Sequence, residues 1–312
     1  MGKHALGYAH VRFDASQVIG KGTMMSRKTM FEIASSKENF SANVESIDQL
    51  FSREGIVLYA DGVYREANMR QSIEQFVSDN LLLEWPYRGG CATTRLLREK
   101  LGIPKFAGSI ACSESTTVLY LEYVSNMLHL FITWADNEGA YGDIDETKLS
   151  ALRGDLAQAI DKLGFEREER GDQVLLLERN AAAKVVLADE PDASVADAIT
   201  DFLHWSNRSD IGAKKTGLVA LARDFEGIKP ILATRDASAL AKDFDFLVNN
   251  LDVRHNNKAG RNASEALANM SNEELLAWLD RVFGLYLEAK LAMKRYGFDE
   301  DMRQLKASLR ER

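Results

Sequence analysis

Cysteine is scarce in this chain: Cys91 and Cys112 are the only two among 312 residues, and they form no CxxC pair. The histidines do not gather into a paired cluster either. This composition is typical of a reducing compartment and gives no basis for a disulfide framework or a zinc site. We therefore expect a protein without a bound metal or other cofactor.

An excess of positive charge is also missing, because 39 Lys and Arg stand against 47 Asp and Glu, a formal net charge of -8. Proteins that coat nucleic acid depend on cations that neutralise phosphates, so the whole chain does not belong to that class. Residues 1–24 contain no apolar run of the kind that a secretory signal needs. We expect a cytoplasmic protein with an ordinary globular core.

The densest apolar stretch, residues 115–134, has a length that would suit a membrane span. However, Glu122, Asn126, His129 and Thr133 recur at i, i+4, i+7 and i+11 and draw one polar stripe along a helix. A bilayer would penalise that stripe, so we expect no membrane partner. The stretch instead predicts a central, mostly buried helix whose one polar edge faces solvent.

The apolar spacing predicts a mainly α fold in three parts. Residues 1–24 form a flexible basic arm, and residues 25–190 form an α-rich N-terminal domain. Two runs that flank Arg170-Gly171-Asp172 predict a small β-hairpin within this domain. After the break at Glu190-Pro191-Asp192, residues 191–312 predict an antiparallel helical bundle with four main helices.

A turn at residues 85–90 ends in two glycines and precedes a helix predicted over residues 92–100. Glycines ahead of a helix can present backbone N–H groups to an anion, and Arg88, Arg95 and Arg98 would add positive charge there. The spacing is not that of a P-loop. An ordinary turn before a surface helix is the alternative interpretation.

The most informative stretch is residues 240–260. Its apolar side chains fall on one stripe of a helix, which then gives way to Asn256-Asn257-Lys258-Ala259-Gly260, a composition that favours a helix end and a turn. Arg254 and His255 therefore stand where a rigid helix becomes a loop. The stripe consists of Leu240, Phe244, Leu247, Val248 and Leu251.

The run Asn249-Asn-Leu-Asp-Val-Arg-His-Asn-Asn257, between this helix and a later long one, resembles the C-terminal helical domain of bacterial abortive-infection proteins. More loosely, residues 192–297 resemble the HEPN superfamily of small helical nucleases. HEPN nucleases carry an Arg, then Asn, Asp or His, then a second His four to six residues after the Arg. Arg254 and His255 match the first two positions. The window for the second His holds Lys258, Ala259 and Gly260, and Arg261 follows it.

The resemblance implies a phage-defence protein, with an N-terminal half that senses or binds a partner such as a phage-derived or toxin–antitoxin protein. For a metal-independent ribonuclease, Arg254 would stabilise the charged phosphate and His255 would act as acid or base. Asn250 and Asn256 would orient them, and the product would be a 2′,3′-cyclic phosphate. The resemblance also implies a homodimer.

Two further hypotheses remain open. In the first, the bundle would be a non-catalytic binding module in which the residues around Arg254 form hydrogen bonds that fix the helix end to its neighbours. The missing second His favours this hypothesis. Alternatively, the chain would be a regulator that binds nucleic acid through Arg88, Arg95, Arg98 and the basic N-terminal arm. Lys258 and Arg261 are the further candidates for contact with nucleic acid. This hypothesis predicts binding that weakens with salt.

Overall fold

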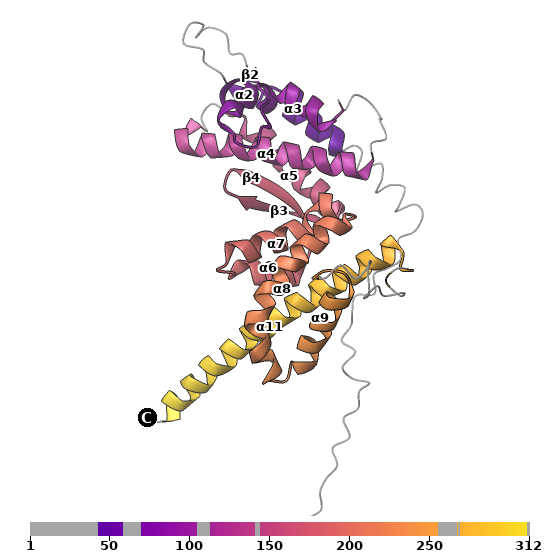
Figure 1. Ribbon diagram of the computed structural model, residues 1–312. Helices are drawn as coiled ribbons and strands as arrows, with labels where there is room; N and C mark the ends of the chain where they lie inside the picture. Colours follow the sequence, from indigo (N-terminus) through magenta and orange to yellow (C-terminus); the bar gives the residue numbers. More distant parts are fainter. Residues whose placement is uncertain are drawn as a thin grey trace, which may run out of the picture.

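The computed structural model of the chain (Figure 1) describes residues 43–58, 70–104, 113–140, 144–254, 267 and 269–310. These residues are mainly helical, as the sequence predicted, with two small antiparallel sheets of two strands each. The basic arm predicted for residues 1–24 lies outside the described residues.

The first part of the described chain surrounds one long helix, α4. Strand β1 pairs antiparallel with β2, with Val57 opposite Gln71. In chain order the elements are helical residues 43–48, the π-helical turn η2 (Gln49–Arg53), β1 (Val57–Leu58), β2 (Arg70–Gln71), α2 (Ile73–Asn80), the short turn η3 (Leu82–Glu84), α3 (Thr94–Leu101), α4 (Glu114–Glu138) and α5 (Glu146–Lys162).

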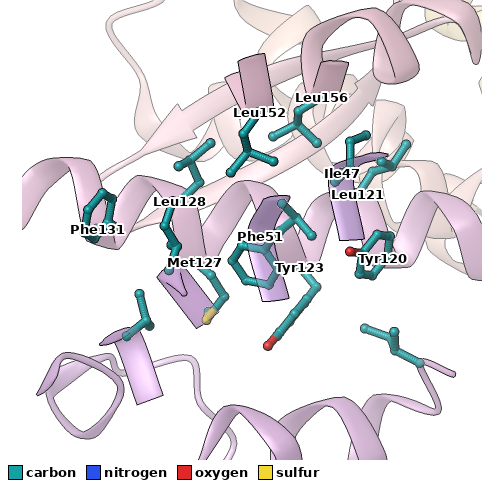
Figure 2. Packing of buried hydrophobic residues seen from close by; sticks show 14 of the residues in the cluster. Ile47, Phe51, Tyr120, Leu121, Tyr123, Met127, Leu128, Phe131, Leu152 and Leu156 are labelled. Atoms are coloured by element: carbon teal, nitrogen blue, oxygen red, sulfur yellow. The ribbon is translucent and has the colours of Figure 1, made fainter. Parts of the chain in front are cut away.

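Helix α4 is the centre of the first hydrophobic core. The Ser113 side chain caps its start by accepting a hydrogen bond from the Thr116 N–H, and Gly139 ends it with a left-handed φ of 63°. Its side chains contact the helices on several sides, as Figure 2 shows. A helix that is apolar around most of its circumference belongs in an interior, which agrees with the predicted buried helix. The labelled core residues include Ile47, Phe51, Tyr120, Leu121, Leu128, Phe131, Leu152 and Leu156.

The predicted β-hairpin is present. Strands β3 (Phe165–Arg170) and β4 (Gln173–Glu178) pair antiparallel in a six-residue register, with Arg170 opposite Gln173 at the turn. Gly171 takes a φ of 57° in that turn, a conformation that glycine adopts without strain. The hairpin lies between α4 and the C-terminal helices in Figure 1.

The polar stripe of α4 covers the free edge of β4. The Asn126 side chain accepts a hydrogen bond from the Val174 N–H at 2.8 Å and donates one to the Val174 carbonyl at 2.7 Å. Glu122 accepts from the Leu176 N–H at 2.8 Å, and His129 Nε2 lies 3.0 Å from the carbonyl of the turn glycine. The expectation that this edge faces solvent was therefore wrong, because helical spacing shows which side chains share a face and not what that face contacts.

The last part of the chain forms a second hydrophobic core. Aromatic rings pack between the helices: Phe202 stacks on Phe283 with centroids 4.1 Å apart, and Phe225 stacks on Phe244 at 4.0 Å. The elements are α6 (Ala181–Ala188), α7 (Ala193–Leu203), the short turn η5 (Trp205–Asn207), α8 (Ile211–Ala233), α9 (Ser238–Asn250) and α11 (Asn272–Arg310). The domain boundary predicted at residue 190 stays a prediction. The buried side chains of α6, which precedes it, and of α7, which follows it, belong to this same core.

Helix α11 begins with a reciprocal cap. The Glu274 N–H donates to Ser271 Oγ at 3.2 Å, and the Ser271 N–H donates to Glu274 Oε2 at 2.9 Å, so the two residues form a capping box. The helix continues without a break to Arg310. Tyr296 still contacts the connection between α8 and α9 through Asp236 and Arg235, and beyond it the helix runs away from the rest of the protein in Figure 1.

Replacing Asn126 tests whether α4 holds the hairpin. Asn126→Ala leaves the buried Val174 N–H and carbonyl without side-chain partners, which we expect to lower the free energy of unfolding by about 3 kcal/mol. Thr133→Ala, at an exposed position of the same stripe, is the control and should change it by less than about 0.5 kcal/mol. Urea unfolding gives both values, and equal midpoints for the two variants would contradict the assignment.

Candidate functional site

The predicted C-terminal site lies where helix α9 ends against helix α8. After the last turn of α9 the chain reverses at Asp252, whose φ of 60° is left-handed. A residue with a side chain pays roughly 1 kcal/mol for this conformation. The Lys215 ammonium of α8 lies 2.6 Å from the Asp252 carboxylate, and each side chain is 16% exposed. This ion pair fixes the reversal to α8.

Arg254 is held by the same helix. Its Nη2 atom donates a hydrogen bond to the Ala222 carbonyl at 2.7 Å and lies 2.6 Å from Glu226 Oε1. The Arg254 backbone N–H donates to the Val248 carbonyl at 3.4 Å, and the side chain is 24% exposed. The guanidinium is thus anchored by a carbonyl and a carboxylate of the fold, on the side of the loop that faces α8.

Of the other residues of the predicted C-terminal site, the structure describes Asn250. Asn250 is exposed, and its side-chain amide donates to the Phe246 carbonyl of its own helix at 2.7 Å. His255, Asn256, Lys258 and Arg261 lie outside the described residues. Arg254 is therefore the one residue of the predicted motif whose contacts the structure defines.

The three arginines of the predicted N-terminal anion site have three different surroundings. Arg95 is 73% exposed and lies 3.9 Å from Glu99, one helical turn away. Arg88 donates to the Cys91 carbonyl at 3.5 Å within the turn. Arg98 is buried, with 9% of its surface exposed. A lysine of the following helix binds the turn itself: the Lys100 ammonium donates a hydrogen bond to the Gly89 carbonyl at 2.7 Å.

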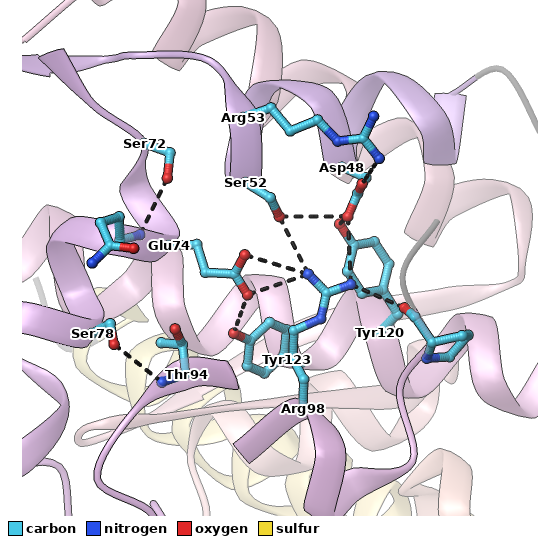
Figure 3. Close-up of polar contacts among 12 residues, drawn as sticks. Asp48, Ser52, Arg53, Ser72, Glu74, Ser78, Thr94, Arg98, Tyr120 and Tyr123 are labelled. Carbon is cyan, nitrogen blue, oxygen red and sulfur yellow. Dashed lines mark hydrogen bonds and ion pairs between the residues drawn. The ribbon is translucent and has the colours of Figure 1, made fainter. Parts of the chain in front are cut away.

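Arg98 is the centre of a buried polar network, drawn in Figure 3. Its Nη1 lies 3.2 Å from Glu74 Oε1, and its Nη2 lies 3.5 Å from Asp48 Oδ1. The Tyr123 hydroxyl donates to Glu74 at 2.7 Å, and the Tyr120 hydroxyl donates to Asp48 at 3.1 Å. The network joins the start of η2 with α2, α3 and α4, and every charged group in it has a partner, as a buried charge requires.

Both tyrosines of the network remain protonated at pH values at which an ordinary tyrosine ionises. Burial raises the pKa of Tyr120 and Tyr123 far above the ordinary tyrosine value, and the adjacent carboxylates of Asp48 and Glu74 raise it further. Burial lowers the pKa of the Arg98 guanidinium, but the charge of Glu74 and its other neighbours outweighs this effect and the net shift is upward. The cluster holds four elements together.

A second polar junction connects the two hydrophobic cores and was not foreseen from the sequence. Glu122 Oε2 of α4 lies 3.0 Å from His204 Nε2 and accepts a hydrogen bond from Trp205 Nε1 at 3.0 Å. His204 Nδ1 lies 2.7 Å from Ser206 Oγ, which fixes the ring. One carboxylate therefore ties α4 to the connection between α7 and α8, in addition to its bond with β4.

An open groove of about 650 Å³ runs between α9 and α11. Its apolar floor includes Phe246, whose ring is 65% exposed, and Trp278, whose ring lies 4.5 Å below the Arg281 guanidinium. The mixture of aromatic floor and charged rim is typical of surfaces that bind an amphipathic helix. The lining residues are Asp243, Phe246, Leu247, Trp278, Arg281, Gly284, Leu285 and Glu288.

The chain matches no protein-family model, no curated protein and no solved structure. Among the described residues, no group of three or more His, Cys, Asp or Glu side chains is placed to hold a metal ion. Within the same residues, no helix has both the length and the apolar character needed to cross a bilayer.

Replacing Arg254 tests its anchoring role. Arg254→Ala removes the bond to the Ala222 carbonyl and the pair with Glu226, and we expect the free energy of unfolding to fall by about 2 kcal/mol. Arg95→Ala, at a 73% exposed arginine, is the control and should leave stability within about 0.5 kcal/mol of wild type. Thermal and urea unfolding measure both, and an unchanged Arg254→Ala protein would show that the contacts with α8 contribute nothing.

The raised tyrosine pKa values predict a loss of stability in alkali. Above about pH 10 the unfolded chain releases its phenol protons while folded Tyr123 retains its own, so the free energy of unfolding falls as pH rises. One such group contributes a slope of about 1.4 kcal/mol per pH unit. Urea unfolding between pH 9 and pH 11 should therefore give a shallower slope for Tyr123→Phe than for wild type. Parallel curves for Tyr123→Phe and wild type would refute this prediction.

Proposed function

We propose that this chain is a defence protein of the abortive-infection type whose C-terminal helices form a HEPN-like, non-catalytic binding module. The observation that carries the proposal is the anchoring of Arg254. Its guanidinium is bound to the Ala222 carbonyl and to the Glu226 carboxylate of α8. In this module Arg254 acts as a structural element that fixes the end of α9 to α8.

Phosphoryl-transfer catalysis makes a different demand on an arginine. The group that stabilises a pentacoordinate phosphate must direct N–H donors at the reacting atoms, and a carboxylate bound to one of these donors competes with the phosphate for it. Glu226 lies 2.6 Å from Arg254 Nη2 and supplies such an anion. The absence of a second His in the window after Arg254 agrees with this, because ribonuclease chemistry needs a proton acceptor for the 2′-hydroxyl.

The remaining surface of the module supports binding as its activity. The groove between α9 and α11 combines the exposed ring of Phe246 and the half-buried ring of Trp278 with side chains of both charges, and both helices contribute to the second core. An exposed ring such as Phe246 is unfavourable in water unless a partner covers it. A rigid, apolar groove is suited to a helical partner and needs no chemistry of its own.

The test uses His255→Ala, which removes the candidate acid or base and leaves Arg254 in place. We expect purified wild type and His255→Ala to leave a labelled RNA oligonucleotide and total tRNA equally intact in EDTA. We also expect both proteins to lower phage plating equally when they are expressed in bacteria, because binding does not require the imidazole. Denaturing gels and plaque counts provide the two measurements.

The competing ribonuclease hypothesis predicts the opposite result. Wild type would then produce RNA ends with a 2′,3′-cyclic phosphate, and His255→Ala would lose both this cleavage and the protection against phage while it unfolded at the wild-type temperature. That outcome would overturn the proposal. EDTA is present so that metal-dependent nucleases do not contribute.

A further inference from the structure

The lining of the α9–α11 groove includes a glycine in the interior of a helix. Gly284 of α11 is exposed, and a Cβ atom added to it would meet nothing within 4 Å. A glycine inside a helix lowers stability by roughly 0.5–1 kcal/mol relative to alanine. No contact among the described residues requires glycine at this position, whereas a second backbone passing close to α11 would require it. Gly284 therefore points to an occupant that approaches this helix closely.

Helices α9 and α11 run antiparallel along the groove and lie side by side in Figure 1. The Tyr296 hydroxyl donates a hydrogen bond to Asp236, just before α9 begins. Further along both helices, the Phe244 and Tyr286 rings have centroids 6.4 Å apart. The first turns of α9 therefore lie beside the later turns of the α11 wall, and the last turns of α9 lie beside its earlier turns.

This arrangement gives the two ends of the groove opposite charges. Asp243 of α9 and Glu288 of α11 bring two carboxylates toward one end. Arg281 lies toward the other end, with its guanidinium 4.5 Å from the centre of the Trp278 ring. None of the three charged side chains has an ion-pair partner among the residues that the structure describes. The groove thus offers an acidic end and a basic end to a ligand.

We infer that the groove binds an amphipathic helix of another protein, which presents lysine or arginine to Asp243 and Glu288 and an aspartate or glutamate to Arg281. The apolar side of that helix covers Phe246, and its backbone passes closest to α11 at Gly284. The inference rests on the proposed function, which takes this groove as the binding surface of the module, and it adds the chemistry of the partner.

The dimensions of the groove define the spacing of the charges on the partner. The wall that α11 contributes extends from Trp278 to Glu288, which is about 15 Å or three turns of helix at 1.5 Å per residue. Arg281 and Glu288 are separated by about 10 Å, or two helical turns. A helix lying along the groove therefore meets both ends with side chains about seven residues apart, which share one of its faces.

The charge of the groove favours a protein helix over a nucleic acid. Phosphates are bound chiefly by lysine and arginine, and here two carboxylates stand against one guanidinium. A groove between two helices with an exposed aromatic ring is instead the surface into which an amphipathic helix lays its apolar face. Charges at the ends of such a groove fix the register of the bound helix and discriminate among partners.

A displayed library of helical peptides tests the inference on the full chain. Each peptide has about 14 residues, a constant leucine stripe, and two positions about seven residues apart that vary among lysine, glutamate and glutamine. We expect wild type to enrich peptides with lysine at one position and glutamate at the other. The double variant Asp243→Lys with Glu288→Lys makes both ends basic and should instead enrich glutamate at both positions.

Filling the groove provides the second measurement. Gly284→Trp places a ring over the groove floor, and we expect the peptide enriched on wild type to bind it about tenfold more weakly or less. The variant should melt no lower than wild type, because tryptophan favours a helix more than glycine does and its Cβ meets no other atom. Gly154→Trp, at an exposed and equally open glycine of α5, is the matched control and should keep the wild-type affinity. Fluorescence anisotropy gives the affinities.

Three results would overturn the inference: enrichment without regard to charge, no enrichment of any peptide, and binding that survives Gly284→Trp. Displacement of the peptide by a labelled RNA oligonucleotide would also overturn it, because the groove would then be a nucleic-acid site. Enrichment without regard to charge would leave the proposed function standing, since the groove would still bind helices. RNA cleavage by wild type would overturn the proposed function alone. None of these variants alters Arg254 or His255, so the two tests give separate answers.

Discussion

The arrangement of this protein depends on a polar contact in which a helix substitutes for a strand. Asn126 bonds to both backbone groups of Val174, and Glu122 takes the next inward N–H of β4, so the edge of a two-stranded sheet is satisfied without a third strand. Unpaired backbone groups in this buried position would cost several kcal/mol. Because Glu122 also binds Trp205 and contacts His204, the same contact connects the two hydrophobic cores. Residues Leu176 and Leu177 of β4 face one core each.

The sequence predicted the elements that are determined locally. The period of α4 and α9 and the hairpin turn at Gly171 each depend on residues a few positions apart, and all three are present. The partner of the α4 stripe could not be predicted in this way. Asn126 and Val174 are separated by 48 residues, and the same stripe would be as well solvated on a surface helix.

The candidate sites show the same division. The spacing placed Arg254 at the end of a helix, but its role depends on whether the guanidinium faces solvent or α8, and its partner Ala222 on α8 lies 32 residues earlier. Arg98 was grouped with Arg88 and Arg95 by composition, although its charge serves Glu74 and Asp48 inside the protein. The sequence also contains four apolar residues at helical spacing near the end of the C-terminal helix, and the many charged residues between them make this pattern hard to recognise. They are Phe298, Met302, Leu305 and Leu309.

The projecting end of α11 is helical because it continues a helix whose earlier turns are anchored in the protein. A helix of the length of residues 297–310 would be marginal alone in water, chiefly because its first turn is costly to form. Here the preceding turns are already fixed by contacts of Tyr286 and Leu287 in the second core, so the extension needs only propagation. Propagation explains why these residues are helical, but it does not explain why their exposed side is apolar. Apolar side chains that are exposed next to one another are typical of surfaces that contact another molecule.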